Sequence, residues 1–185
     1  PALLILWEKC SLDRELIHEY LISKFGDVTR KIVRWNSINF SKNLTRFYGQ
    51  KMPPHSEKEL HIGNGAFDVY IFESKDSKYS NRITSEGLKS VNTVLFDLKS
   101  VLRELDGGGH RVHCTVDAFE GERDTWLLFA ATTTELLTVS KNSAGYFERD
   151  LIGTTRWTDI SEVFRTLNKC CNYVVLRNFG SFPYE

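Results

Sequence analysis

The chain has 185 residues, enough to bury one sizeable hydrophobic core and too few for two comfortable domains. Hydrophobic residues make up 41 % and charged residues 26 %, and 24 Lys and Arg residues balance 24 Asp and Glu residues. A formal net charge of zero argues against general electrostatic attachment to nucleic acid or acidic lipid, which requires surplus positive charge. A net charge of zero does not argue against a local basic cleft for a phosphate ligand, because such a cleft requires only a few cations.

The longest apolar run, residues 2–7, is well below the roughly 20 residues that cross a bilayer. It has neither the basic stretch before it nor the small-residue cleavage site after it that are typical of a signal peptide. The four cysteines are not spaced as the ligands of a zinc site are. We therefore expect buried or half-buried thiols in a reducing compartment. They are Cys10, Cys114, Cys170 and Cys171. A cytoplasmic protein without a membrane span is therefore expected.

The first part of the chain alternates between apolar runs and amphipathic segments. The predicted elements are a buried strand over 3–8, a helix capped by Asp13 and stopped by Gly26, a strand over 28–35, a short helix from Ser41 and a long surface loop over 50–65. Apolar residues at steps of three and four define the expected buried face of the first helix. They are Leu12, Leu16, Ile17, Tyr20, Leu21 and Phe25. His55 and His61 are both expected at the surface of the loop.

The alternation continues through the middle of the chain. The predicted elements are a strand over 67–73, a polar link over 74–87, an amphipathic helix over 91–105 stopped by Gly107-Gly108-Gly109, a strand over 111–115 and a helix over 120–131. Strands and helices in this order predict an α/β (α+β) domain. Specifically, we expect a ferredoxin-like, four-stranded antiparallel sheet covered by helices.

The last part of the chain is predicted to be an addition to this core, with a core over 1–131 and an extension over 132–185. The predicted elements of the extension are a helix over 132–139, a break at 142–145, a helix capped by Asp159 and a strand over 173–176. The final residues have a loop composition. We therefore expect the extension to be truncated from a longer protein.

Residues 107–115, Gly-Gly-Gly-His-Arg-Val-His-Cys-Thr, are the most informative segment for function. Glycines allow a backbone to approach a ligand closely, and His110 and His113 are expected to point to the same face of the strand. One interpretation is a phosphate or nucleotide site with a histidine nucleophile. The other is a glycine helix stop followed by a strand with two partly exposed histidines.

Residues 108–129 (GGHRVHCTVDAFEGERDTWLLF) are similar to the signature of the nucleoside diphosphate kinase family. In that family Asn-x-x-His-Gly-Ser-Asp is followed without a gap by a helix ending in Leu-Trp-Phe. The resemblance implies that His113 is the phosphorylated histidine and that Asp124 is the carboxylate that holds it. It also places Thr115 on the serine after the histidine and His110 on the asparagine that touches the nucleotide sugar.

The resemblance extends over roughly residues 3–130. Arg82 matches an arginine that clamps a phosphate, and Tyr48 in Arg-Phe-Tyr-Gly-Gln matches a tyrosine beside the histidine. The sequence departs from the family where Ile-Lys-Pro-Asp is missing after the first strand, although Lys9 lies nearby. The loop that closes over the base is replaced by the helix over 91–105, in which Lys99 or Arg103 can supply the second phosphate-binding cation.

The resemblance implies phosphoryl transfer through a phosphohistidine on a nucleotide or sugar-nucleotide, with Mg²⁺ bound to ATP or another nucleoside triphosphate and no protein metal site. A homo-oligomer is also compatible with it. The alternative is a catalytically silent nucleotide-binding or scaffold domain of a larger glycan- or nucleotidyl-transferase protein. A further alternative is a protein-interaction module. Residues 173–179 resemble the lead-in strand of nucleotidyltransferase-like proteins encoded with polysaccharide genes, which suggests polysaccharide biosynthesis.

Overall fold

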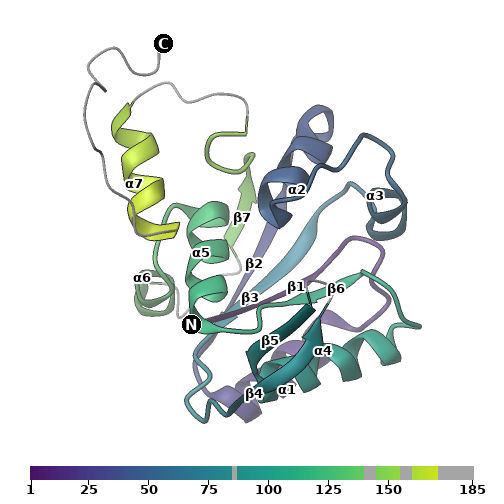
Figure 1. Cartoon of the computed structure of the whole chain (residues 1–185). Helices are drawn as coiled ribbons and strands as arrows, with labels where there is room; N and C mark the ends of the chain where they lie inside the picture. Colours follow the sequence, from purple (N-terminus) through teal and green to yellow (C-terminus); the bar gives the residue numbers. More distant parts are fainter. Residues whose placement is uncertain (85–86, 140–144, 155–159, 171–185) are drawn as a thin grey trace.

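The structure of the chain is a computed structural model that describes residues 1–84, 87–139, 145–154 and 160–170 (Figure 1). It is a mixed α/β fold built on one five-stranded sheet with the strand order β6-β1-β3-β2-β7. These strands are β1 (Ala2–Leu6), β2 (Val28–Arg34), β3 (Phe67–Phe72), β6 (Val112–Cys114) and β7 (Gly145–Glu148). The predicted α+β class is confirmed, and the antiparallel order of β6, β1, β3 and β2 is compatible with a ferredoxin-like arrangement.

The sheet has one strand more than predicted. Strand β7 pairs in parallel with β2, with Ile32 opposite Tyr146, whereas the sequence predicts only a break near its start. This pairing joins residues more than a hundred positions apart, so local sequence carries little signal for it. Residues of the predicted extension therefore form the edge of the same sheet as the core.

Strands β1 and β3 are inner strands of the sheet, and all of their residues are buried. Burial of alternate residues on both faces requires that helices cover both faces of the sheet. The side chains of these two strands divide between the two faces of the sheet. One face carries Leu3, Ile5, Val69 and Ile71, and the other carries Leu4, Leu6, Tyr70 and Phe72. This period of two also places Phe67 on the same side as Val69 and Ile71, as alternation along the predicted strand over 67–73 requires.

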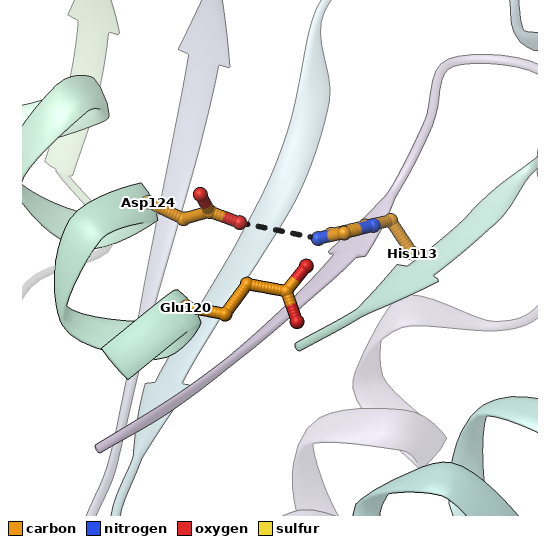
Figure 2. Close-up of side chains that lie close together, drawn as sticks. All are labelled: His113, Glu120 and Asp124. Carbon is orange, nitrogen blue, oxygen red and sulfur yellow. Dashed lines mark hydrogen bonds and ion pairs between the residues drawn. The ribbon is translucent and has the colours of Figure 1, made fainter. Parts of the chain in front are cut away.

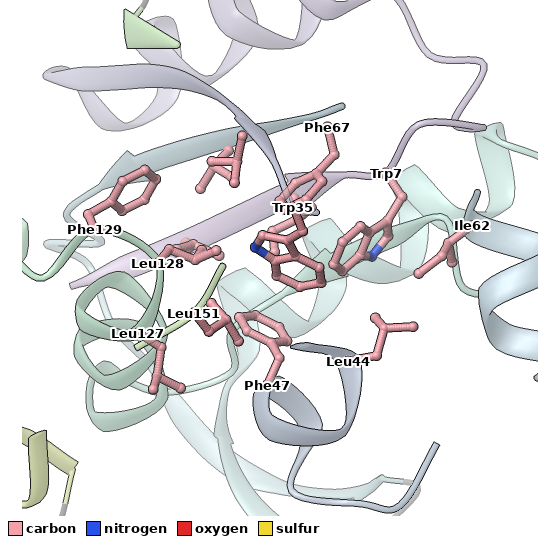
Figure 3. Packing of buried hydrophobic residues seen from close by; sticks show 14 of the residues in the cluster. Trp7, Trp35, Leu44, Phe47, Ile62, Phe67, Leu127, Leu128, Phe129 and Leu151 are labelled. Carbon is pink, nitrogen blue, oxygen red and sulfur yellow. The ribbon is translucent and has the colours of Figure 1, made fainter. Parts of the chain in front are cut away.

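Helices cover each face with apolar side chains. The first face packs against α2 (Phe40–Tyr48), α3 (Glu57–Ile62) and α5 (Ala118–Phe129), and Figure 3 shows the aromatic centre of this core. Trp7 lies there with its ring centroid 4.6 Å from that of Phe67 and 5.6 Å from that of Trp35. The second face packs against α1 (Arg14–Phe25) and α4 (Thr93–Leu105). Helix α7 (Ile160–Cys170) contacts α5.

The first helix begins and ends as predicted, but its buried face is narrower than predicted. The Asp13 carboxylate accepts hydrogen bonds from the backbone N–H groups of Glu15 and Leu16, and Gly26 follows the last turn. Only Ile17 and Leu21 are buried, whereas Leu16 is 64 % exposed. Because Ile17 and Leu21 are four residues apart, α1 meets the sheet along one line of side chains.

Two segments predicted as irregular contain regular structure. The polar link includes β4 (Tyr79–Thr84), which pairs with β5 (Gly87–Asn92) as an antiparallel hairpin. Both strands are largely exposed, so they lack the apolar alternation that reveals a strand. The predicted loop over 50–65 contains α3, whose first turn is capped by Ser56. Helix α4 begins at Thr93 because the Asn92 side chain caps it, which leaves Val91 in β5.

The remaining elements are short, and part of the predicted extension lies outside the described residues. The remaining elements are a 3₁₀ turn over Ser37–Asn39 and helix α6 (Thr133–Val139). Helix α6 agrees with the helix predicted over 132–139. The strand predicted over 173–176, the cap Asp159 and Cys171 all lie outside the described residues. Cys10 and Cys114 are buried free thiols, as predicted. No helix in the described ranges has both the length and the apolar character that a membrane span requires.

A buried polar cluster fixes the segment after β7 to helix α2. The Asn43 side chain donates to Asp150 Oδ1 at 2.7 Å, and its own Oδ1 accepts from the Leu151 backbone at 2.9 Å and from Thr154 Oγ1 at 2.7 Å. Asp150 also accepts from the Asn39 amide at 2.7 Å. Asn43 is fully buried, and its hydrogen bond from the Leu151 backbone is buried, whereas its bonds with Asp150 and Thr154 are partly exposed to solvent.

Replacing Asn43 with alanine is expected to lower the free energy of unfolding by about 2–4 kcal/mol, because it removes the shared, fully buried partner of three polar groups. Urea unfolding followed by tryptophan fluorescence measures this change. The matched control is Asn64→Ala at an exposed position, with an expected change within about 0.5 kcal/mol. Equal stability of the two variants would show that the segment after β7 is not anchored through Asn43.

Candidate functional site

The site is centred on His113 in the middle of β6. Strand β6 lies at the edge of the sheet, and His113 is opposite Ile5 of β1. Cross-strand partners share a face of the sheet, so His113 points toward the side covered by α2 and α5. The chain then returns over this side of the sheet as helix α5. Asp117 caps the start of α5, because its carboxylate accepts a hydrogen bond from the Glu120 backbone N–H at 2.7 Å.

Helix α5 brings Asp124 to His113. Nε2 of the imidazole and Oδ2 of the carboxylate are 3.3 Å apart (Figure 2). Asp124 is fully buried, and its other oxygen accepts hydrogen bonds from Nε and Nη2 of Arg123 at 2.8 and 2.6 Å. Burial raises the pKa of Asp124 to about 7, against the opposing effect of the Arg123 guanidinium. The contact between Asp124 and His113 that the resemblance implies is present.

The imidazole of His113 is held in an apolar setting and stays neutral at pH 7. Its ring lies edge-on to Phe47 and Tyr48, with centroid separations of 5.3 and 5.6 Å, and the residue is 7 % exposed. Burial lowers the pKa of His113 to about 3, and Lys99, Lys58 and Arg103 also lower it, while Glu120 raises it. Tyr48 therefore lies beside the histidine as the resemblance implies, and burial raises the pKa of its hydroxyl.

Two of the basic groups near His113 come from α4. Arg103 donates through Nε to the backbone carbonyl of Val112 at 2.9 Å, which places its guanidinium against β6. Burial lowers the pKa of Arg103 and of Lys99. Because β6 is an edge strand, these long side chains can act on His113 from beside the sheet. Both candidate phosphate-binding cations of this helix therefore act electrostatically on the histidine.

A third basic group, Lys58, was missed by the sequence prediction. Its Nζ lies 3.0 Å from the centroid of the Tyr48 ring, a cation–π contact. Burial lowers the pKa of Lys58 to about 8, and Arg103 lowers it further. Lys58 was missed because its helix was predicted as loop, although Ser56 followed three residues later by Glu59 is a capping signal that indicates a helix start.

His113, Glu120 and Asp124 have ligand atoms within 4.8 Å of one another, a spacing that a metal ion could use. Their contacts favour another role. Oε2 of Glu120 accepts from the Val116 backbone at 2.7 Å, and both oxygens of Asp124 already have partners. The nearby cations also oppose a divalent ion. The residues present therefore do not fit a magnesium site of the protein's own.

Three other predicted residues have local structural contacts. Lys9 donates to the backbone carbonyl of Leu60 at 2.8 Å and so holds α3. The Thr115 hydroxyl is buried and accepts from the Leu3 backbone N–H at 3.0 Å, which joins β6 to β1. Arg82 is exposed in β4 and donates to Ser80 Oγ at 2.7 Å. Among the described contacts, none joins Lys9, Thr115 or Arg82 to His113.

His110 is not on the face of β6 that carries His113, so that expectation is wrong, because side chains three positions apart on a strand point to opposite faces. Strand β6 begins only at Val112, and His110 lies in the preceding turn. Its backbone N–H donates to Nδ1 of His61 at 3.2 Å, and its exposed side chain faces the His61 ring. His55 is exposed as predicted, whereas His61 is part of this contact.

Comparison of the chain with models of known protein families, with curated proteins and with solved structures found no match.

Proposed function

We propose that the chain transfers phosphoryl groups through His113, with a nucleotide or sugar-nucleotide as donor. One observation supports this most directly. A buried, neutral imidazole is held at Nε2 by Asp124, while Lys58, Lys99 and Arg103 act on it electrostatically. A neutral imidazole is the nucleophilic form, and clustered cations stabilise the charge of a transferred phosphoryl group.

The proton between His113 and Asp124 decides which nitrogen can react. When Asp124 is ionised, Nε2–H donates to its carboxylate and the lone pair remains on Nδ1. The two hydrogen bonds from Arg123 favour this ionised form. Asp124 thus acts as a positioning residue that selects Nδ1 as the nucleophile.

The proposed step conserves atoms and charge. Nδ1 attacks the terminal phosphorus of a nucleoside triphosphate, a P–N bond forms, and the P–O bond to the nucleoside diphosphate breaks in line with it. Lys58, Lys99 and Arg103 compensate the charge on the transferred group and on the leaving diphosphate. A second in-line step passes the phosphoryl group from Nδ1 to an oxygen of the acceptor and regenerates the neutral imidazole.

Incubation with γ-labelled ATP and magnesium chloride tests the proposal. Phosphohistidine is expected on the wild type as an acid-labile, base-stable label, and no label is expected on His113→Asn. The matched control is His55→Asn, which removes an exposed imidazole and should leave labelling unchanged. Equal labelling of wild type and His113→Asn would overturn the assignment of His113.

A catalytically silent nucleotide-binding domain is the second candidate, and two observations favour it. His113 is nearly buried against Phe47 and Tyr48. A surface cavity of about 280 Å³ lies elsewhere, lined by Phe25, Asp27 and Glu73 among others, without His113. Nucleotide binding by the wild type without any covalent label would support this second candidate.

A further inference from the structure

The contact between His61 at the end of α3 and His110 before β6 fixes the hydrogen-bonding state of His61. The His110 backbone N–H donates to His61 Nδ1 at 3.2 Å, so in the neutral ring the proton must be on Nε2. The two imidazole rings are 6.0 Å apart between centroids and nearly perpendicular, at 86°. The second nitrogen of His61 is therefore a donor in both its neutral and its charged form.

The glycine before His110 makes this contact possible. Gly109 has φ +85°, which favours glycine, and a Cβ placed on it would lie 2.1 Å from Cε1 of His61. The backbone of the loop thus lies directly against the imidazole. Gly109, the last glycine of the run, is therefore required for the close approach of the loop to His61.

Positive charge extends from His113 to this histidine pair. Burial lowers the pKa of His110, and Lys58, Arg103 and His61 lower it further, with Glu57 as an opposing acidic group. Lys58 and Arg103 also act on His113. Lys58 lies 3.0 Å from the centroid of the Tyr48 ring, which is itself 5.6 Å from the His113 ring. Arg103 donates to the carbonyl of Val112, the residue before His113, so both cations lie next to residues that contact or adjoin His113. His110 is exposed, so a ligand can reach it from solvent.

We propose that His61 and His110, together with Lys58 and Arg103, form a second anion subsite beside the phosphate site at His113. The ligand would be a compound with two linked anionic groups, such as a diphosphate. One group would lie at His113 and the other would accept hydrogen bonds from His61. This inference rests on the proposed function, because it takes the first anionic group to lie at His113.

Calorimetric titration at pH 7 with inorganic phosphate and with pyrophosphate tests the subsite. His61→Ala is expected to weaken pyrophosphate binding about tenfold, the effect of one charge-assisted hydrogen bond, and to leave phosphate binding nearly unchanged. Gly109→Ala should have the same effect although His61 is retained, because the new Cβ displaces the ring. Lys58→Met should weaken both ligands. His55→Asn is the control and should weaken neither.

The outcomes separate this inference from the proposed function. Equal loss of phosphate and pyrophosphate binding in His61→Ala, or no loss of either, would overturn the subsite while leaving His113 phosphorylation intact. Pyrophosphate binding that depends on His61 without any phosphate binding would support the subsite and count against a phosphate at His113. Binding of neither anion by the wild type would overturn both. Circular dichroism establishes that each variant is folded.

Discussion

Asparagine in place of Asp124 is expected to slow the phosphorylation of His113 by roughly 10²–10⁴-fold, the range for residues that orient a ligating or catalytic imidazole. The amide of asparagine can donate to Nε2, which would place the imidazole proton on Nδ1. The proposed nucleophile would then have no lone pair. The initial rate of acid-labile labelling from γ-labelled ATP measures the effect.

A readout besides rate distinguishes this positioning role from a purely structural one. Nitrogen chemical shifts of the His113 ring report which nitrogen carries the proton. Asp124→Asn is expected to move the proton from Nε2 to Nδ1 in a protein whose unfolding curve remains cooperative. Asp124→Glu, which keeps a carboxylate, should restore the wild-type tautomer. An unchanged labelling rate in Asp124→Asn would contradict the assigned role of the carboxylate.

The histidine and its carboxylate could be predicted from the sequence because they are local. A strand carries His113, a short turn follows, and a helix that starts at Ala118 returns Asp124 to the same place. His113 and Asp124 are only eleven positions apart, so most of the geometry of the pair is local. The two central strands were equally predictable, because β1 is an uninterrupted apolar run and apolar residues alternate along β3 at Phe67, Val69 and Ile71.

The rest of the site could not be predicted, because tertiary structure places it. Lys58 and His61 belong to a helix of six residues, too short and polar to show amphipathic periodicity. The contact between His61 and His110 joins residues 49 positions apart and depends on the backbone of Gly109. Only the capping signal at Ser56 pointed to this helix. The sequence therefore predicts the nucleophile better than the groups that surround it.

The stability of the wild type is expected to depend little on the His113–Asp124 pair between about pH 4.5 and 6.5. Unfolded, the pair holds one proton in this window, because the ordinary pKa is about 6.5 for histidine and about 3.9 for aspartate. Folded, the pKa of His113 is about 3 and that of Asp124 is about 7, so the pair again holds one proton. Stability changes with pH only where these proton counts differ.

Removal of either partner should expose opposite slopes. In Asp124→Asn, the buried His113 keeps a lowered pKa, so the unfolded state binds more protons and stability is lost as the pH falls below about 6.5. In His113→Gln, the buried Asp124 keeps a raised pKa, so the folded state binds more protons and stability is lost as the pH rises from about 4 toward 7. Each slope is at most about 1.4 kcal/mol per pH unit, or about 2–3 kcal/mol across the window.

Urea unfolding at half-unit steps from pH 4.5 to 6.5 measures these slopes, and subtracting the wild-type curve cancels the contribution of other titrating groups. The two difference curves are expected to cross with opposite signs. Parallel difference curves would mean that burial does not shift the pKa values of the two side chains in opposite directions. Opposite slopes would show that burial favours the neutral form of each side chain, so that the folded pair holds its one proton on Asp124 below about pH 7. Loss of that proton frees Nδ1 of His113 for attack on phosphorus. The labelling rate should accordingly fall below about pH 7, in the same range in which Asp124 becomes protonated.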